Sequence, residues 1–114
     1  MTDILTSIKS LSEEIRLRIL LLLNEREACV CELMAVFDMA QSKLSHHLIT
    51  LRDAGLLTDE RRGKWNYYRL DKHSLTPVNR ELVSTLGKWT VGDATIERDI
   101  RTLEQVKRRM QICC

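Results

Sequence analysis

Four cysteines arranged as two close pairs are the residues of this chain whose type and spacing most clearly suggest chemistry. Cys29 and Cys31 are separated by one residue, and Cys113 and Cys114 are adjacent at the end of the sequence. Thiolates are soft ligands, and thiolates held this close together can share one thiol-seeking ion. Single cysteines often serve as small buried hydrophobes, but here no cysteine is left over. All four are therefore candidate metal ligands.

The composition describes one small domain in a reducing compartment. A chain of 114 residues, 44% of them hydrophobic, suits a single domain over residues 1–114. No stretch approaches the ~20 apolar residues that span a bilayer, and the first residues lack the features of a signal peptide. We therefore expect a cytoplasmic protein without a membrane partner. Because cytosolic thiols stay reduced, paired cysteines there favour metal or redox chemistry over structural disulfides.

Two short helices joined by a turn are predicted directly after the first cysteine pair. Apolar residues at helical spacing predict a helix that starts just after Cys31. After a turn at residues 38–40, a second helix starts between residues 40 and 42 and ends at Gly55, which fits a C-terminal glycine cap. This is the outline of a helix-turn-helix, whose second helix enters the major groove of DNA.

The faces of this second helix follow from its rotation of 100° per residue. Leu44, Leu48 and Leu51 fall on one stripe, which we expect to be buried, and His47 lies close to it. His47 is thus predicted to be a structural, hydrogen-bonded residue rather than one that reads DNA. The polar positions elsewhere on the helix are the candidate DNA-binding residues Gln41, Ser42, Lys43, Ser45 and His46.

A basic hairpin follows the helix-turn-helix. Residues 56–60 and 65–70 predict two strands on either side of a glycine-containing turn. Arg61, Arg62 and Lys64 gather at this turn. Directly after a helix-turn-helix, such a tip is typical of a wing, and we interpret its three cations as DNA-binding residues. An ordinary solvated turn is the alternative interpretation.

The two ends of the chain also predict helices. Apolar residues at helical spacing predict a first helix over about residues 3–11, and Ser12 offers an N-cap for a second, central core helix. Thr76-Pro77 predicts the start of a fifth helix. A last helix over about residues 95–112 carries one narrow, nearly heptad-like apolar stripe that Lys107 interrupts. A late helix of this kind usually packs outside its own small core, so a partner subunit is its expected neighbour.

These elements predict a mainly α fold with a β-hairpin wing, a winged helix-turn-helix that dimerises through its first and last helices. With this outline, the sequence resembles the ArsR/SmtB family of metalloregulatory repressors, especially its arsenite-sensing branch. The resemblance covers about residues 11–70 and rests on the segments LSEEIRL (11–17), CVCEL (29–33), KLSHHL (43–48) and GKWNYYRL (63–70). It implies a homodimeric, non-enzymatic repressor that binds double-stranded operator DNA. As(III) or Sb(III), bound by cysteine thiolates, would release it, with no organic cofactor.

One departure from the family pattern concerns the ion site. Arsenite sensors of this type carry a third cysteine three residues after the second, where this chain has Met34. As(III) and Sb(III) prefer three thiolates, and Cys113 or Cys114 would add the third to Cys29 and Cys31. Because residues two apart on a helix point about 200° apart, a shared ion needs Cys29 outside the helix or the helix start unwound. Binding would then distort a helix that abuts the DNA-reading helix.

Other functions stay open at this point. Zinc would accept four thiolates, although the family's zinc sensors use Asp and His ligands on the last helix, which has no histidine here. A repressor of the same fold could sense oxidation by forming a disulfide. In a different class, a small thiol redox protein would use Cys29 and Cys31 catalytically, but the sequence has no Cys-x-x-Cys and no βαβ pattern nearby. His46 stands where many relatives have an arginine, which is a point of difference in base readout.

Overall fold

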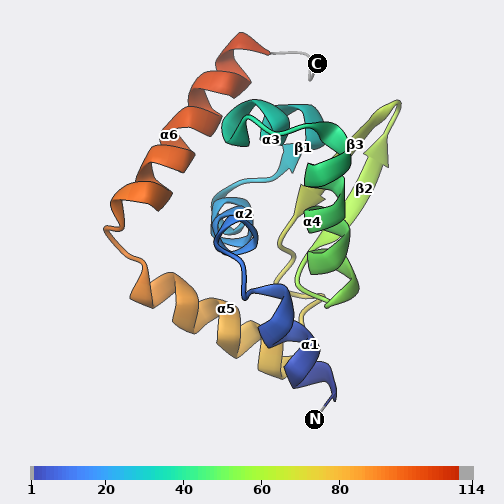
Figure 1. Cartoon of the computed structure of the whole chain (residues 1–114), viewed down its shortest axis with the longest axis vertical. Coiled ribbons are helices and arrows are strands. Elements are labelled where there is room, and N and C mark those ends of the chain that lie inside the picture. Colours follow the sequence, from blue (N-terminus) through green and yellow to red (C-terminus); the bar gives the residue numbers. More distant parts are fainter. Residues whose placement is uncertain (1, 111–114) are drawn as a thin grey trace.

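The computed structural model describes residues 2–110, which form six helices and a three-stranded sheet (Figure 1). The helices are α1 (Thr2–Ser10), α2 (Glu14–Glu25), α3 (Val30–Phe37), α4 (Gln41–Asp53), α5 (Pro77–Trp89) and α6 (Ala94–Arg109). The strands are β1 (Ala28–Cys29), β2 (Thr58–Arg62) and β3 (Trp65–Arg69). Within this part of the chain, no helix is long and apolar enough to cross a membrane. The tail cysteines Cys113 and Cys114 lie outside the described residues.

Helix α2 lies at the centre of the molecule, and the other helices surround it (Figure 1). Its Ile19, Leu20 and Leu22 are fully buried in one cluster with the leucines of α4. Burying a side chain of this size contributes about 1.5–3 kcal/mol, so α2 is the core helix, as predicted. The predicted cap is wrong, because the N-cap falls one residue later. The Ser12 hydroxyl instead donates to the carbonyl oxygen of Lys9 at 2.7 Å and closes the preceding helix.

Helices α3 and α4 form the predicted helix-turn-helix. Asp38 ends α3 with a φ of 49°, a left-handed conformation that a short polar side chain tolerates. After α4, Gly55 has a φ of 78°, and the Leu56 N–H donates to the carbonyl oxygen of Leu51 at 3.0 Å. This is the hydrogen bond of a glycine C-cap, so the predicted end of α4 is confirmed. Leu44, Leu48 and Leu51 are fully buried, which confirms the predicted apolar face.

The sheet contains the predicted hairpin and one strand that the sequence did not predict. Strands β2 and β3 pair antiparallel, with Arg62 opposite Trp65 across a two-residue loop that starts at Gly63. Strand β1 pairs antiparallel with the other edge of β3, so the strand order is β1-β3-β2. The first predicted strand, residues 56–60, starts two residues later because Leu56 and Leu57 are buried in the core instead.

The last two helices begin at clear caps, and the second of them packs on its own chain. The Asn79 N–H donates to the Thr76 hydroxyl at 3.2 Å, which confirms the predicted start of α5. Helix α6 lies against α2 and α3 (Figure 1). Its Leu103 and Val106 are buried there. Leu103, a residue of the predicted stripe, thus packs on its own chain, and the contact of this stripe with a partner stays a prediction.

Apolar side chains that stay exposed gather where α1 meets α5. The Ser7 hydroxyl donates to Asn79 Oδ1 at 2.6 Å and joins the two helices. Around this contact the exposed apolar side chains are Ile4, Leu5 and Ile8 on α1 and Val78 on α5. The first helix thus presents an apolar face that nothing else among residues 2–110 covers.

Candidate functional site

The first cysteine pair spans the junction between β1 and α3. Cys29 is the second residue of β1 and the N-cap of α3, with extended backbone angles of φ −86° and ψ 164°. Helix α3 begins at Val30, earlier than predicted, so Cys31 lies inside its first turn. Cys29 is therefore outside the helix, as a shared ion requires, and the helix start does not need to unwind. Cys29 is 1% exposed, and Cys31 is half-buried.

Both cysteines of this pair are oxidised in the structure. Cys29 and Cys31 are each disulfide-bonded, and no cysteine among residues 2–110 is a free thiol. Because the thiolate is the metal ligand, the form that binds an ion is the reduced one. Within the same residues, no group of three or more His, Cys, Asp or Glu side chains is placed to hold a metal ion. A three-thiolate site therefore needs a donor from outside the described part of the chain.

A buried carboxylate connects this junction to the last helix. Glu32 is 4% exposed, and its Oε1 accepts the Cys29 backbone N–H at 2.9 Å, as expected for an acidic residue in a first helical turn. The same oxygen accepts a hydrogen bond from Lys107 Nζ of α6 at 2.9 Å. Glu32 thus holds the start of α3 and the last turn of α6 together. Sequence reasoning missed this pair because its members are 75 positions apart.

Two further ion pairs attach α6 to the core helix. Arg18 of α2 donates two hydrogen bonds to the Asp99 carboxylate, at 2.9 and 2.8 Å, and this contact raises the pKa of Arg18. Arg26 Nη1 donates to both carboxylate oxygens of Glu104 at 2.6 Å. Together with the buried carboxylate of α3, these contacts fix the direction in which the chain leaves α6.

The polar side of α4 faces solvent, as predicted. Gln41, Ser42, Lys43 and His46 are exposed, and Ser45 is half-buried. Ile49 adds an exposed apolar side chain to this surface. A helix that presents a polar, partly basic face of this kind can lie in the major groove of DNA.

His47 is a structural residue, as predicted. It is buried, and its Nδ1 lies 3.3 Å from Nη1 of Arg16 on α2. Burial, and next the charge of Arg16, lower the pKa of His47 below its ordinary value. The neutral ring of His47 therefore ties α4 to the core helix α2.

The three cations of the wing are exposed, but they differ in their contacts. Among residues 2–110, no ion pair involves Arg61 or Lys64, and Lys64 Nζ lies 5.0 Å from the Trp65 ring. Arg62, in contrast, forms ion pairs with Glu27 and Glu60. Its two neighbours already neutralise its charge, so Arg61 and Lys64 are the better candidates for phosphate contacts.

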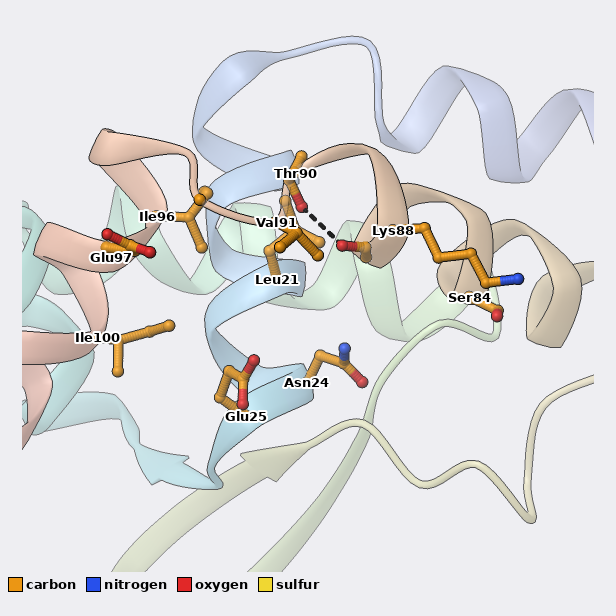
Figure 2. Close-up of a pocket in the computed structure, with 12 residues that line it drawn as sticks. Leu21, Asn24, Glu25, Ser84, Lys88, Thr90, Val91, Ile96, Glu97 and Ile100 are labelled. Atoms are coloured by element: carbon orange, nitrogen blue, oxygen red, sulfur yellow. Dashed lines mark hydrogen bonds between the residues drawn. The ribbon is translucent and has the colours of Figure 1, made fainter.

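A cleft of about 440 Å³ between α2, α5 and α6 is a second feature of the structure (Figure 2). Leu21, Ile96 and Ile100 line it together with polar side chains, and Figure 2 shows these residues coming from all three helices. The cleft contains no cysteine and no histidine. It therefore lacks the donors for a thiol-seeking ion and is separate from the cysteine pair.

Comparisons with known proteins agree with this arrangement. The model of a family described as "Bacterial regulatory protein, arsR family" matches residues 13–59. The arsenic resistance transcriptional regulator ArsR2 of Pseudomonas putida is 38% identical over 110 residues, which cover 93% of each protein. The arsenical resistance operon repressor of Escherichia coli is 52% identical over 66 residues, 57% of this chain and 56% of that protein.

Solved structures show the same architecture. The homodimeric winged helix-turn-helix domain of Mb0332 from Mycobacterium bovis has a TM-score of 0.63 and 26% identity, covering 82% of each chain. Reduced HlyU from Vibrio cholerae has a TM-score of 0.65 and 27% identity, covering 77% of this chain and 88% of that one. The match to ArsR2 runs through the cysteine pair, the helix-turn-helix and the wing. This chain belongs to the arsR family of bacterial regulatory proteins, which are transcriptional regulators and not enzymes.

Proposed function

We propose that this chain is an arsenic-responsive transcriptional repressor that binds operator DNA as a homodimer and leaves it when As(III) or Sb(III) binds reduced cysteines. The observation that carries this proposal is the position of Cys29 and Cys31. One lies in an extended strand and the other in the first turn of the next helix, in a chain whose relatives are named arsenic resistance regulators. Two thiolates so placed can face one ion.

The DNA-binding part of the proposal uses α4 and the wing. The exposed residues of α4 would contact base edges in the major groove, where base pairs can be told apart. Arg61 and Lys64 would contact phosphates beside it, which positions the protein without reading sequence. Both parts come from one chain, so a dimer would present two such units to two half-sites.

The apolar face of α1 supports the homodimer. Ile4, Leu5 and Ile8 are exposed there, and the similar Mb0332 domain is described as homodimeric. Burying these side chains against a second copy would remove an exposed apolar patch from water. Leu103 and Val106 of the last helix are buried within their own chain. In this proposal, α1 therefore supplies apolar surface to the contact between the two copies.

Cys113 or Cys114 would complete a three-thiolate site with Cys29 and Cys31. The Glu32–Lys107 contact supports this, because it fixes the last turn of α6 beside the first turn of α3. Cys113 follows Lys107 by six positions, and six extended residues span at most about 20 Å. The tail of the same chain is thus long enough to supply the third ligand.

Arsenic X-ray absorption in thiol-free buffer tests the third ligand. In the Cys113→Ser/Cys114→Ser protein we expect fewer than three sulfur neighbours, with oxygen in the vacated position. The matched control is Met34→Leu, which removes the sulfur at the position of the family's third cysteine and should leave three sulfur neighbours. Three sulfurs in the tail variant would contradict a ligand role for the tail.

Fluorescence anisotropy of a labelled duplex tests the function itself. The duplex is selected by the reduced protein from a random pool, and arsenite, antimonite, zinc and hydrogen peroxide are then added separately. We expect arsenite and antimonite to release the duplex and zinc to leave it bound. Release by zinc alone, or by no ion, would contradict the proposal.

An oxidation-sensing repressor is the second candidate function, because Cys29 and Cys31 each take part in a disulfide in this structure. Two thiols would pass two electrons and two protons to hydrogen peroxide, which gives one disulfide and two water molecules. In the same anisotropy assay, this function predicts release by peroxide and recovery with a dithiol reductant. Release by arsenite without any loss of reducing conditions would favour the arsenic sensor instead.

A further inference from the structure

The strand that carries Cys29 is part of the wing. In the β1–β3 pairing, Cys29 lies opposite Tyr67 and Ala28 lies opposite Tyr68. Tyr67 and Tyr68 also pair with Glu60 and Asp59 of β2, so β3 joins the cysteine strand directly to the outer strand of the hairpin. Neighbouring strands are only about 4.8 Å apart and share backbone hydrogen bonds, so displacing one strand also displaces the strand bonded to it.

A second connection links the same two regions through side chains. Glu27 precedes β1, and its Oε2 lies 2.7 Å from Nη2 of Arg62, the last residue of β2. The guanidinium group of Arg62 also lies over the Tyr67 ring, 4.3 Å from its centroid. Arg62 therefore contacts the residue before the cysteine strand and the residue that pairs with Cys29. Its position at the base of the wing tip makes it a bridge between the two.

The position of Cys29 decides which element moves first when an ion binds. Cys29 is in β1 and outside α3, whereas Cys31 is held by the hydrogen-bonded first turn of α3. Drawing the two sulfurs toward one ion therefore displaces the strand more readily than the helix. The backbone of that strand is bonded to β3, and the residue before it is paired with Arg62.

We propose that the wing carries the arsenic signal to DNA, through the β1–β3 pairing and the Glu27–Arg62 ion pair. This inference rests on the proposed function and names the route by which the cysteine pair regulates DNA binding. Arg62 is then a positioning residue that passes a displacement of the cysteine strand on to the wing, and it is not itself a phosphate contact. The side chains of Arg62 and Glu27 are 44% and 38% exposed, so their pair contributes little to folding and can be removed without unfolding the protein.

Glu27→Gln tests this route, with Glu25→Gln as the matched control. Glu25 lies two positions earlier, is exposed, and has no ion pair among residues 2–110. The reduced variants are measured for arsenite binding without DNA and for DNA affinity with and without saturating arsenite. In Glu27→Gln we expect unchanged arsenite stoichiometry and a DNA affinity in the absence of arsenite that stays within about threefold. The loss of DNA affinity caused by arsenite should become at least about fivefold smaller, a change typical of a broken coupling.

The control and a second variant make the result specific. Glu25→Gln should respond to arsenite as the parent does, and Arg62→Met should reproduce the effect of Glu27→Gln. If Glu27→Gln still loses DNA affinity as fully as the parent when arsenite binds, the wing route is wrong. That result would leave the arsenic-responsive function intact.

The fluorescence of Trp65 reports on the environment of the wing without DNA being present. Trp89 is 78% exposed, so Trp89→Phe leaves Trp65, the cross-strand partner of Arg62, as the only tryptophan. We expect arsenite to shift the emission of Trp65 in this protein and the shift to disappear when Glu27→Gln is added. Emission that stays unchanged while arsenite is bound would overturn the wing route. If arsenite shifts the emission of Trp65 but releases no DNA, that result would instead contradict the proposed function.

Discussion

The DNA-facing side of α4 and the cysteine segment, residues 27–32, are built in opposite ways. On α4, Gln41, Ser42, Lys43 and His46 are exposed, and no ion pair among residues 2–110 holds any of them. In the cysteine segment, the strand is paired with the wing and its flanking carboxylates are paired with arginine and lysine. Side chains that contact a partner molecule need no fixed contacts within their own chain. A segment that binds a regulatory ion, in contrast, must be connected to the surface that the ion regulates.

This difference predicts how substitutions in the two regions behave. Under the proposed function, a change on the exposed side of α4 would remove a contact to DNA and no contact within the chain, so its effect should be local. A change in the cysteine segment should act at a distance, on DNA release or on the attachment of α6.

Cys29→Ser and Cys31→Ser should each abolish release by arsenite and leave DNA affinity unchanged. A hydroxyl is a poor replacement for a thiolate on a soft ion, and neither residue lies on the DNA-facing side of α4. Anisotropy of labelled duplex with increasing arsenite measures the effect. Met34→Leu is the control and should be released normally. Normal release of either serine variant would mean that the sensor lies elsewhere.

Glu32→Ala should destabilise the protein by about 3 kcal/mol or more, because it leaves the half-buried ammonium of Lys107 without its partner and the Cys29 N–H without an acceptor. Urea unfolding of the reduced protein measures the loss. Glu97→Ala, an exposed position on α6 without an ion pair among the described residues, is the control. Adding Lys107→Met should recover part of the loss, and a cost equal to that of the control would show that the pair is unimportant.

Arg61→Ala and Lys64→Ala should each lower the slope of log affinity against log salt by about 0.9, the value for one lost phosphate contact. From sequence alone, the same result was expected of Arg62→Ala. The ion pairs of Arg62 now separate it from the other two, so its slope should stay unchanged. Titrations of one duplex over a series of salt concentrations compare all three variants. Three equal slopes would mean that Arg62 leaves its carboxylates for DNA.

The smallest expected effect is on the pH dependence of stability. Burial and Arg16 lower the pKa of His47 in the folded protein below its unfolded value of about 6.5, so below that pH the unfolded chain binds more protons. Stability is therefore complete above about pH 6.5 and falls as the pH drops toward the folded pKa. His47→Gln should flatten this part of the profile in urea unfolding. His73→Gln, at an exposed site, should not, and equal profiles would exclude His47 as the cause.

Much of the fold could be predicted because its signals are local. The leucine stripe of α4, Gly55 at its end and Thr76 before α5 each act within a few residues, and the structure confirms them. Strand β1 was missed because two residues are too few to show an alternating pattern. The contact of Leu103 on α6 with its own chain was also missed, because periodicity shows that a face is apolar but not what covers it.

The candidate site divides in the same way. The exposed residues of α4 followed from helical geometry that a sequence contains, whereas the sequence left open whether Cys29 lies outside the helix or the helix start unwinds. The contacts that distinguish Arg62 from Arg61, and those that hold Glu32, join residues far apart in the chain. Such pairs have no signature in a single sequence, because their members become neighbours only after the fold is complete.

The pairing of β1 with β3 also has a consequence for the order of folding. The hairpin closes between Arg62 and Trp65, whereas Ala28 must find Tyr68, which is 40 positions away. Closing a longer loop costs more chain entropy, so the hairpin is complete before the cysteine strand docks on it. During synthesis and refolding, Cys29 is thus enclosed beside β3 only after the hairpin has formed. Under the proposed function, the thiol of Cys29 can therefore meet arsenite before the DNA-binding fold is complete.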